Sequence, residues 1–109
     1  MHTKVEIALR GIAASSALER CIGQEVRKLE EIFDGIRSCQ VVAEALQQQK
    51  QRGAQFAVRL IVTLPGTEVV VNREHADDLH VALREAFAAA GLQLKHHMRR
   101  TIKQDHARK

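Results

Sequence analysis

Alternating hydrophobic and polar residues predict four β-strands in this chain. The strands are expected at residues 5–10, 39–46, 55–64 and 67–72. In the first, Val5, Ile7 and Leu9 share one side, which predicts a half-buried strand. In the third, one face is wholly apolar: Phe56, Val58, Leu60, Val62 and Leu64. Pro65-Gly66 separates the last two strands and predicts a tight turn.

A different spacing, with apolar residues every three or four positions, predicts a helix after the first strand. Ser16-Ala-Leu-Glu19 has the sequence of a capping box and marks the start of this helix, and Asp34-Gly35 marks its end. Its apolar stripe consists of Leu18, Ile22, Val26, Leu29 and Phe33.

A second helix is expected from about residue 76 to residue 102. Asp77 and Asp78 suit the positive end of the helix dipole at its first turn. Gly91 falls inside this helix, where it indicates either a bend or close packing. The apolar stripe of this helix consists of Leu79, Leu83, Ala86, Phe87, Ala90 and Leu94.

The element order is therefore β-α-β-β-β-α, and the fold class is α+β. Two amphipathic helices each need an apolar surface to cover, so we expect both on one face of a four-stranded, mostly antiparallel sheet. At 109 residues the chain is predicted to be a single domain, residues 1–109. The other face of the sheet is expected to be open, with Ala57, Arg59, Ile61, Val69 and Val71 on it.

The positive charge of the chain is concentrated at its end. Residues 95–109 carry six Lys or Arg and one acid, a net of +5, whereas the whole chain is only +4. Helix-dipole complementarity accounts for two or three such cations, so the basic helix end and tail indicate a polyanionic partner. A basic band is expected on the helix side of the molecule. In the first helix, Arg20 and Arg27 lie opposite the apolar stripe and Lys28 lies at its edge. The second helix contributes Arg84, Lys95 and Arg99. Arg100 and Lys103 extend this band, and Lys50 and Arg52 add charge from the loop at 47–53.

Catalytic and metal-binding patterns are not found in the sequence. The six histidines form no known ligand set, and His96 and His97 are adjacent, so a helix would point them about 100° apart. Cys21 and Cys39 match no zinc or redox spacing and are expected to be reduced thiols. We therefore expect that the protein is not an enzyme and that it binds no cofactor and no small-molecule substrate. Without a signal peptide or a membrane-spanning segment, the chain is expected to be a soluble cytoplasmic protein.

The segment SSALERCIGQEVRKLEEIFDGI, residues 15–36, resembles the first helix of the ribosome hibernation promoting factor family, also called ribosome-associated inhibitors or sigma-factor modulation proteins. The segment HADDLHVAL, residues 75–83, is similar to the opening of that family's second helix. The predicted element order is also the family's, and the chain resembles its short forms. Where the family commonly has Lys-Leu-x-Arg-Gln, this chain has Ala89-Ala90-Gly91-Leu92-Gln93, which removes two cations.

This resemblance implies a partner and a role. Family members bind the small ribosomal subunit in the channel for mRNA and tRNA, contact rRNA through basic residues of both helices, and silence ribosomes during stress or stationary phase. Carried over by position, it implies that 16S rRNA is bound by Arg20, Arg27 and Lys28 and by Lys95, His96, Arg99 and Arg100. Two alternatives stay open: a non-ribosomal protein that binds double-stranded RNA, and a regulator that forms a homodimer through its open sheet face.

Overall fold

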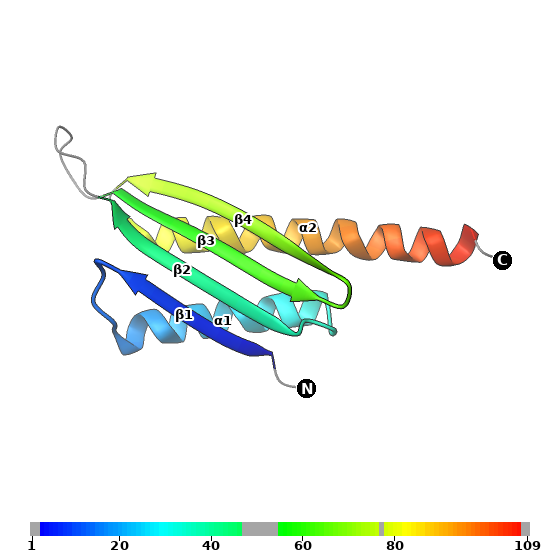
Figure 1. The fold of residues 1–109 in the computed structure, drawn as a ribbon, viewed down its shortest axis with the longest axis horizontal. Coiled ribbons are helices and arrows are strands. Elements are labelled where there is room, and N and C mark those ends of the chain that lie inside the picture. Colours follow the sequence, from blue (N-terminus) through cyan, green and yellow to red (C-terminus); the bar gives the residue numbers. More distant parts are fainter. Residues whose placement is uncertain (1–2, 47–54, 77, 108–109) are drawn as a thin grey trace.

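The computed structural model describes residues 3–46, 55–76 and 78–107, with backbone only at residues 75, 76 and 101–107. It confirms the predicted order of elements: β1 (Lys4–Arg10), α1 (Ser16–Ile32), β2 (Ser38–Leu46), β3 (Gln55–Leu64), β4 (Thr67–Ala76) and α2 (Leu79–Ala107). The four strands form one sheet in the order β1-β2-β3-β4. β1 and β2 are parallel, because α1 crosses over between them, and the other two pairs are antiparallel. Both helices lie on the same side of this sheet (Figure 1).

The ends of the helices differ from the predicted ones by a few residues. α1 is capped by Ser15 and not by Ser16, because the Ser15 hydroxyl accepts a hydrogen bond from the backbone N–H of Leu18 at 3.1 Å. α2 begins at Leu79 and runs to Ala107. Asp78 lies just before its first turn, where its carboxylate accepts a hydrogen bond from the N–H of Val81 at 3.2 Å. Asp78 therefore acts as a side-chain cap, while Asp77 lies outside the described residues.

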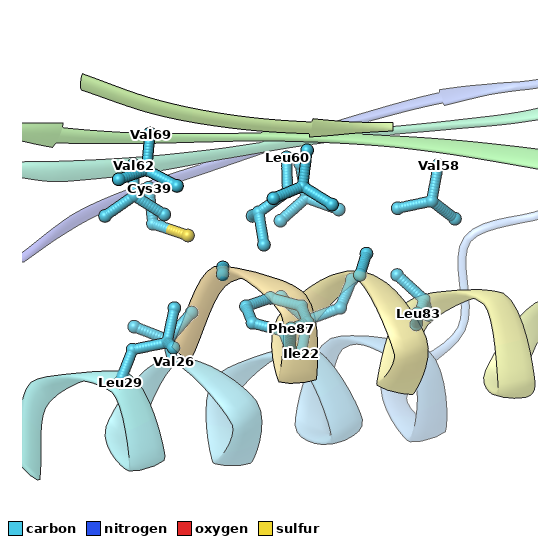
Figure 2. Packing of buried hydrophobic residues seen from close by; sticks show 14 of the residues in the cluster. Ile22, Val26, Leu29, Cys39, Val58, Leu60, Val62, Val69, Leu83 and Phe87 are labelled. Atoms are coloured by element: carbon cyan, nitrogen blue, oxygen red, sulfur yellow. The ribbon is translucent and has the colours of Figure 1, made fainter. Parts of the chain in front are cut away.

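The core lies between the sheet and the two helices (Figure 2). The predicted apolar face of β3 is buried from Val58 to Leu64, whereas Phe56 at the start of the strand is half-buried. Apart from the half-buried Phe33 and Leu79, both predicted helix stripes are buried, so the periodicity identified the inward faces correctly. Cys39 belongs to this core and is 1% exposed.

The prediction that Val69 and Val71 lie on the open face of the sheet is wrong. Pro65 and Gly66 form a two-residue turn, with Gly66 at a φ of 79°, and this turn pairs Leu64 with Thr67. The register then places Val69 beside Val62 and Val71 beside Leu60. Since cross-strand partners share a face, both valines point into the core, where they are 7% and 3% exposed.

The open face is polar with a small apolar centre. Ala57, Arg59 and Ile61 lie there as predicted, and Val70 and Asn72 of β4 replace the two misplaced valines. The exposed cations of this face alternate with carboxylates: Lys4, Arg10 and Arg59 with Glu6, Glu44 and Glu74. A face of mixed charge is not the broadly apolar surface that a tight homodimer would need.

β1 is less covered than its alternation predicts. Val5 and Ile7 are 41% and 37% exposed, although they lie on the helix side of the sheet beside Cys39 and Val41. β1 is an edge strand with a neighbour on one side only, so its apolar side chains are covered from one flank.

Gly91 lies where the two helices approach each other. A Cβ atom at this position would be 3.2 Å from Cδ1 of Ile32 and 3.7 Å from Cδ2 of Leu29. Of the two alternatives for this glycine, the structure therefore supports close packing, which lets α1 and α2 lie side by side on the sheet.

Candidate nucleic-acid interface

The cations predicted on the helices are exposed to solvent where the structure describes their side chains. α1 and α2 bury their apolar stripes in the core, so the residues opposite those stripes face outward. The described basic residues of this set are all exposed: Arg20, Arg27, Lys28, Arg84, Lys95, His96, Arg99 and Arg100. The last turns of α2 continue beyond the sheet, towards the C-terminus (Figure 1).

Three of these cations line a groove between the two helices, which we call the interhelical groove. Lys28 comes from α1, and Arg84 and Lys95 come from α2. The groove has a volume of about 580 Å³, and its floor includes Phe87, Ala88 and Gly91. Ala88 and Gly91 are small and leave room, so the long basic side chains on both sides can reach a chain of phosphates lying between the helices.

Three more basic residues line a second groove, between α2 and the start of β4, which we call the β4 groove. His96, Arg99 and Arg100 belong to α2, and Thr67 and Glu68 belong to β4. This groove has a volume of about 730 Å³. Leu92 lines both grooves, so α2 forms the ridge between them.

Among these cations, those of α2 have surroundings that favour an external anion, whereas Lys28 is paired with Glu25, which also lines the interhelical groove. In the described part of the chain the ion pairs are Lys4–Glu6 at 3.3 Å and Glu25–Lys28 at 3.1 Å. No described carboxylate pairs with Arg84, Lys95, Arg99 or Arg100. Their charge is therefore available to phosphate oxygens, which Arg binds in a bidentate manner and Lys as a point charge.

Some predicted site residues lie elsewhere. Arg20 and Arg27 are exposed on α1 but line neither groove. Lys50 and Arg52 lie outside the described residues. Lys103 lies in α2, but only its backbone is described.

The groove residues that the sequence interpretation missed include Thr67, Gln93 and Leu92. Thr67 and Gln93 are 26 positions apart in the chain, and only the packing of α2 on β4 brings them into one groove. The position of Leu92 outside the apolar stripe of its helix predicts that this leucine is exposed. It does not predict which residues surround it.

Of the two free cysteines, Cys21 is half-buried on α1 and Cys39 is buried on β2. Burial raises the pKa of the Cys39 thiol to about 12, with a smaller contribution from the charge of Glu30, so this thiol is not ionised at neutral pH. Among the side chains that the structure describes, no three from His, Cys, Asp or Glu are grouped as metal ligands would be. Among the described helices, none combines the length and hydropathy needed to cross a bilayer.

The sequence of this chain, compared with models of known families, matches one of them over most of its length. Residues 5–102 match the model described as sigma 54 modulation protein / S30EA ribosomal protein. The chain belongs to this family. The resemblance of residues 15–36 and 75–83 to the sigma-factor modulation proteins is thereby confirmed. The comparison with curated proteins returned no match.

Two solved structures have a fold similar to that of this chain. A ribosomal subunit interface protein from Coxiella burnetii superposes with a TM-score of 0.74 at 17% identity, over 88% of this chain and 98% of that one. The N-terminal domain of Protein Y from Thermus thermophilus superposes with a TM-score of 0.68 at 25% identity, again over 88% and 98%. Both show that the α+β arrangement of this S30EA family member is one that solved proteins adopt.

Proposed function

We propose that this protein is a ribosome-associated translation inhibitor that binds the 16S rRNA of the small subunit in the channel for mRNA and tRNA. In this role it silences ribosomes in the cytoplasm during stress or stationary phase. Residues 1–109 act as a single ribosome-binding domain, whose basic end is residues 95–109.

One observation carries this proposal: exposed cations from both helices line two adjacent grooves, and no described carboxylate neutralises those of α2. RNA backbones present rows of phosphates that such grooves can follow. Membership of a ribosomal protein family makes rRNA the polyanion that fits best.

The proposed contacts fall into four groups. Lys28, Arg84 and Lys95 bind phosphates along the interhelical groove, and His96, Arg99 and Arg100 bind them in the β4 groove. Arg20 and Arg27 add contacts from the outer face of α1. The remaining predicted cations, Lys50, Arg52 and Lys103, form the fourth group and are proposed to add further contacts with RNA.

Inhibition by this protein needs no chemistry. The molecule extends 59 × 28 × 18 Å, and the 29-residue α2 is about 43 Å long at a rise of 1.5 Å per residue. A rigid body of this size in the channel excludes mRNA and tRNA by volume. Translation is then restored when the protein dissociates, which high salt promotes by competing for the phosphates.

Co-sedimentation with ribosomes tests this proposal. Purified protein is mixed with 30S and 70S particles and separated on sucrose gradients at about 50 and about 200 mM salt. We expect co-sedimentation at the lower salt, loss of it at the higher salt, and competition by mRNA with initiator tRNA. A protein that stays at the top of the gradient at every salt concentration, or binds without competition, would contradict it.

A further inference from the structure

Leu92 is the most exposed large hydrophobic residue of the described chain, at 59%. It stands on α2 three positions before Lys95 and seven before Arg99, so all three lie on neighbouring turns. An exposed leucine on its own requires no explanation. This one lines both basic grooves, so any chain of phosphates bound in them passes beside it.

The β4 groove beside Leu92 contains the groups that a nucleotide requires. Val69 adds apolar surface to it, the His96 imidazole is exposed, and the Thr67 hydroxyl and Gln93 amide can hydrogen bond to the edge of a base. Arg99 and Arg100 at the same groove supply charge for a phosphate. The Glu68 carboxylate repels phosphate and accepts hydrogen bonds from exocyclic amino groups, so a nucleotide is expected to have its phosphate on the arginine side.

We propose that the β4 groove holds an unpaired nucleotide of the RNA, with its base against Leu92 and its phosphate on Arg99 and Arg100. Paired RNA buries its bases in the stack, and an unpaired nucleotide exposes the apolar surface that Leu92 can cover. The proposal rests on the proposed function for the identity of the RNA. It adds a contact that is apolar, and therefore one that salt does not screen.

Salt dependence separates this contact from the phosphate contacts. Affinity for 30S subunits and for a 12-nucleotide unpaired RNA of mixed sequence is measured at several salt concentrations. We expect Leu92→Ala to weaken binding of both by roughly 3- to 10-fold, because it removes apolar contact area, with the slope of log K against log salt unchanged. Leu92→Phe should bind at least as tightly as the wild type, since an aromatic ring stacks on a base.

Val5→Ala is the matched control, because Val5 is an exposed aliphatic residue on β1, far in the sheet from the β4 groove. It should leave both affinities unchanged. Circular dichroism of each variant verifies the fold.

The outcomes distinguish this inference from the proposed function. If the wild type binds 30S subunits and Leu92→Ala binds them equally well, the nucleotide contact is refuted while the ribosomal role stands. If the wild type does not bind 30S subunits but binds the oligonucleotide, and Leu92→Ala weakens that binding, the ribosomal role is refuted and the nucleotide contact stands. If Leu92→Ala abolishes self-association in sedimentation velocity and leaves RNA affinity intact, the groove holds a second copy of the chain and the inference is wrong.

Discussion

The two halves of α2 belong to one continuous helix but have opposite surroundings. From Leu79 to Leu94 the helix packs on β3 and β4 and against α1, and its inward residues are buried. From Lys95 onward the described side chains are mostly exposed and basic. His97 lies at the boundary, where its ring meets that of Phe33 edge to face at 5.8 Å between centroids. The first half therefore holds the fold together, and the second presents charge.

This division has a physical benefit for a protein that binds RNA. Cations placed over the core lie beside side chains that must stay buried, so their hydration competes with that burial. Cations on a projecting helix stay hydrated until phosphate replaces the water. Substitutions of the buried residues in the first half should consequently change stability, whereas substitutions of the exposed cations in the second half should change RNA affinity and its salt dependence.

The largest effect on stability is expected at the centre of the packed half. Leu83 is 0% exposed, and Leu83→Ala removes three buried carbons and leaves a cavity. The free energy of unfolding should fall by about 3 kcal/mol, measured by urea denaturation. Ala88→Ser on the exposed side of the same helix is the control, with a change of less than about 0.5 kcal/mol. Equal stability of the two variants would show that this half does not hold the fold together.

A smaller loss is expected where the helices meet. Any Cβ atom at position 91 would lie 3.2 Å from Cδ1 of Ile32, and Gly91→Val adds two methyl groups to that Cβ, so overpacking should cost about 2 kcal/mol. In the double variant Gly91→Val/Ile32→Ala the cost of the valine should shrink, because the clash is removed. Additive costs in this double-mutant cycle would mean that α1 and α2 do not touch at Gly91.

The smallest effect is expected at the start of α2. Asp78→Ala removes the acceptor for the Val81 N–H and should lower the free energy of unfolding by about 1 kcal/mol. Asp78→Ser keeps a capping oxygen and should recover most of this loss. A serine variant as unstable as the alanine variant would show that the capping hydrogen bond does not account for the contribution of Asp78 to stability.

Much of the fold could be predicted because local sequence determines it. The apolar stripes of both helices and the inward face of β3 follow directly from periodicity. The register of β4 could not be read in the same way, because Val69, Val70 and Val71 are all apolar and alternation is lost. Only the two-residue turn at Pro65-Gly66 decides which of them point inward.

The site was predictable in part for a related reason. The exposure of Arg84, Lys95 and Arg99 follows from their angle to the apolar stripe. The two grooves depend on how α2 packs against α1 and β4, which involves residues far apart in the sequence. The composition of the β4 groove, with Thr67, Gln93 and Leu92 beside the arginines, therefore emerges only in three dimensions.

The salt dependence of 30S binding decides whether the basic half of α2 holds RNA phosphates while the open sheet face does not. Two triple variants lose equal charge: Lys95→Gln/Arg99→Gln/Arg100→Gln on α2, and Lys4→Gln/Arg10→Gln/Arg59→Gln on the sheet. The α2 variant should keep its stability, lose about 100-fold in affinity at low salt, and show a slope of log K against log salt that is shallower by roughly 2–3. The sheet variant should retain the wild-type slope. Equal slopes for the two variants, or a shallower slope for the sheet variant alone, would contradict this division of roles.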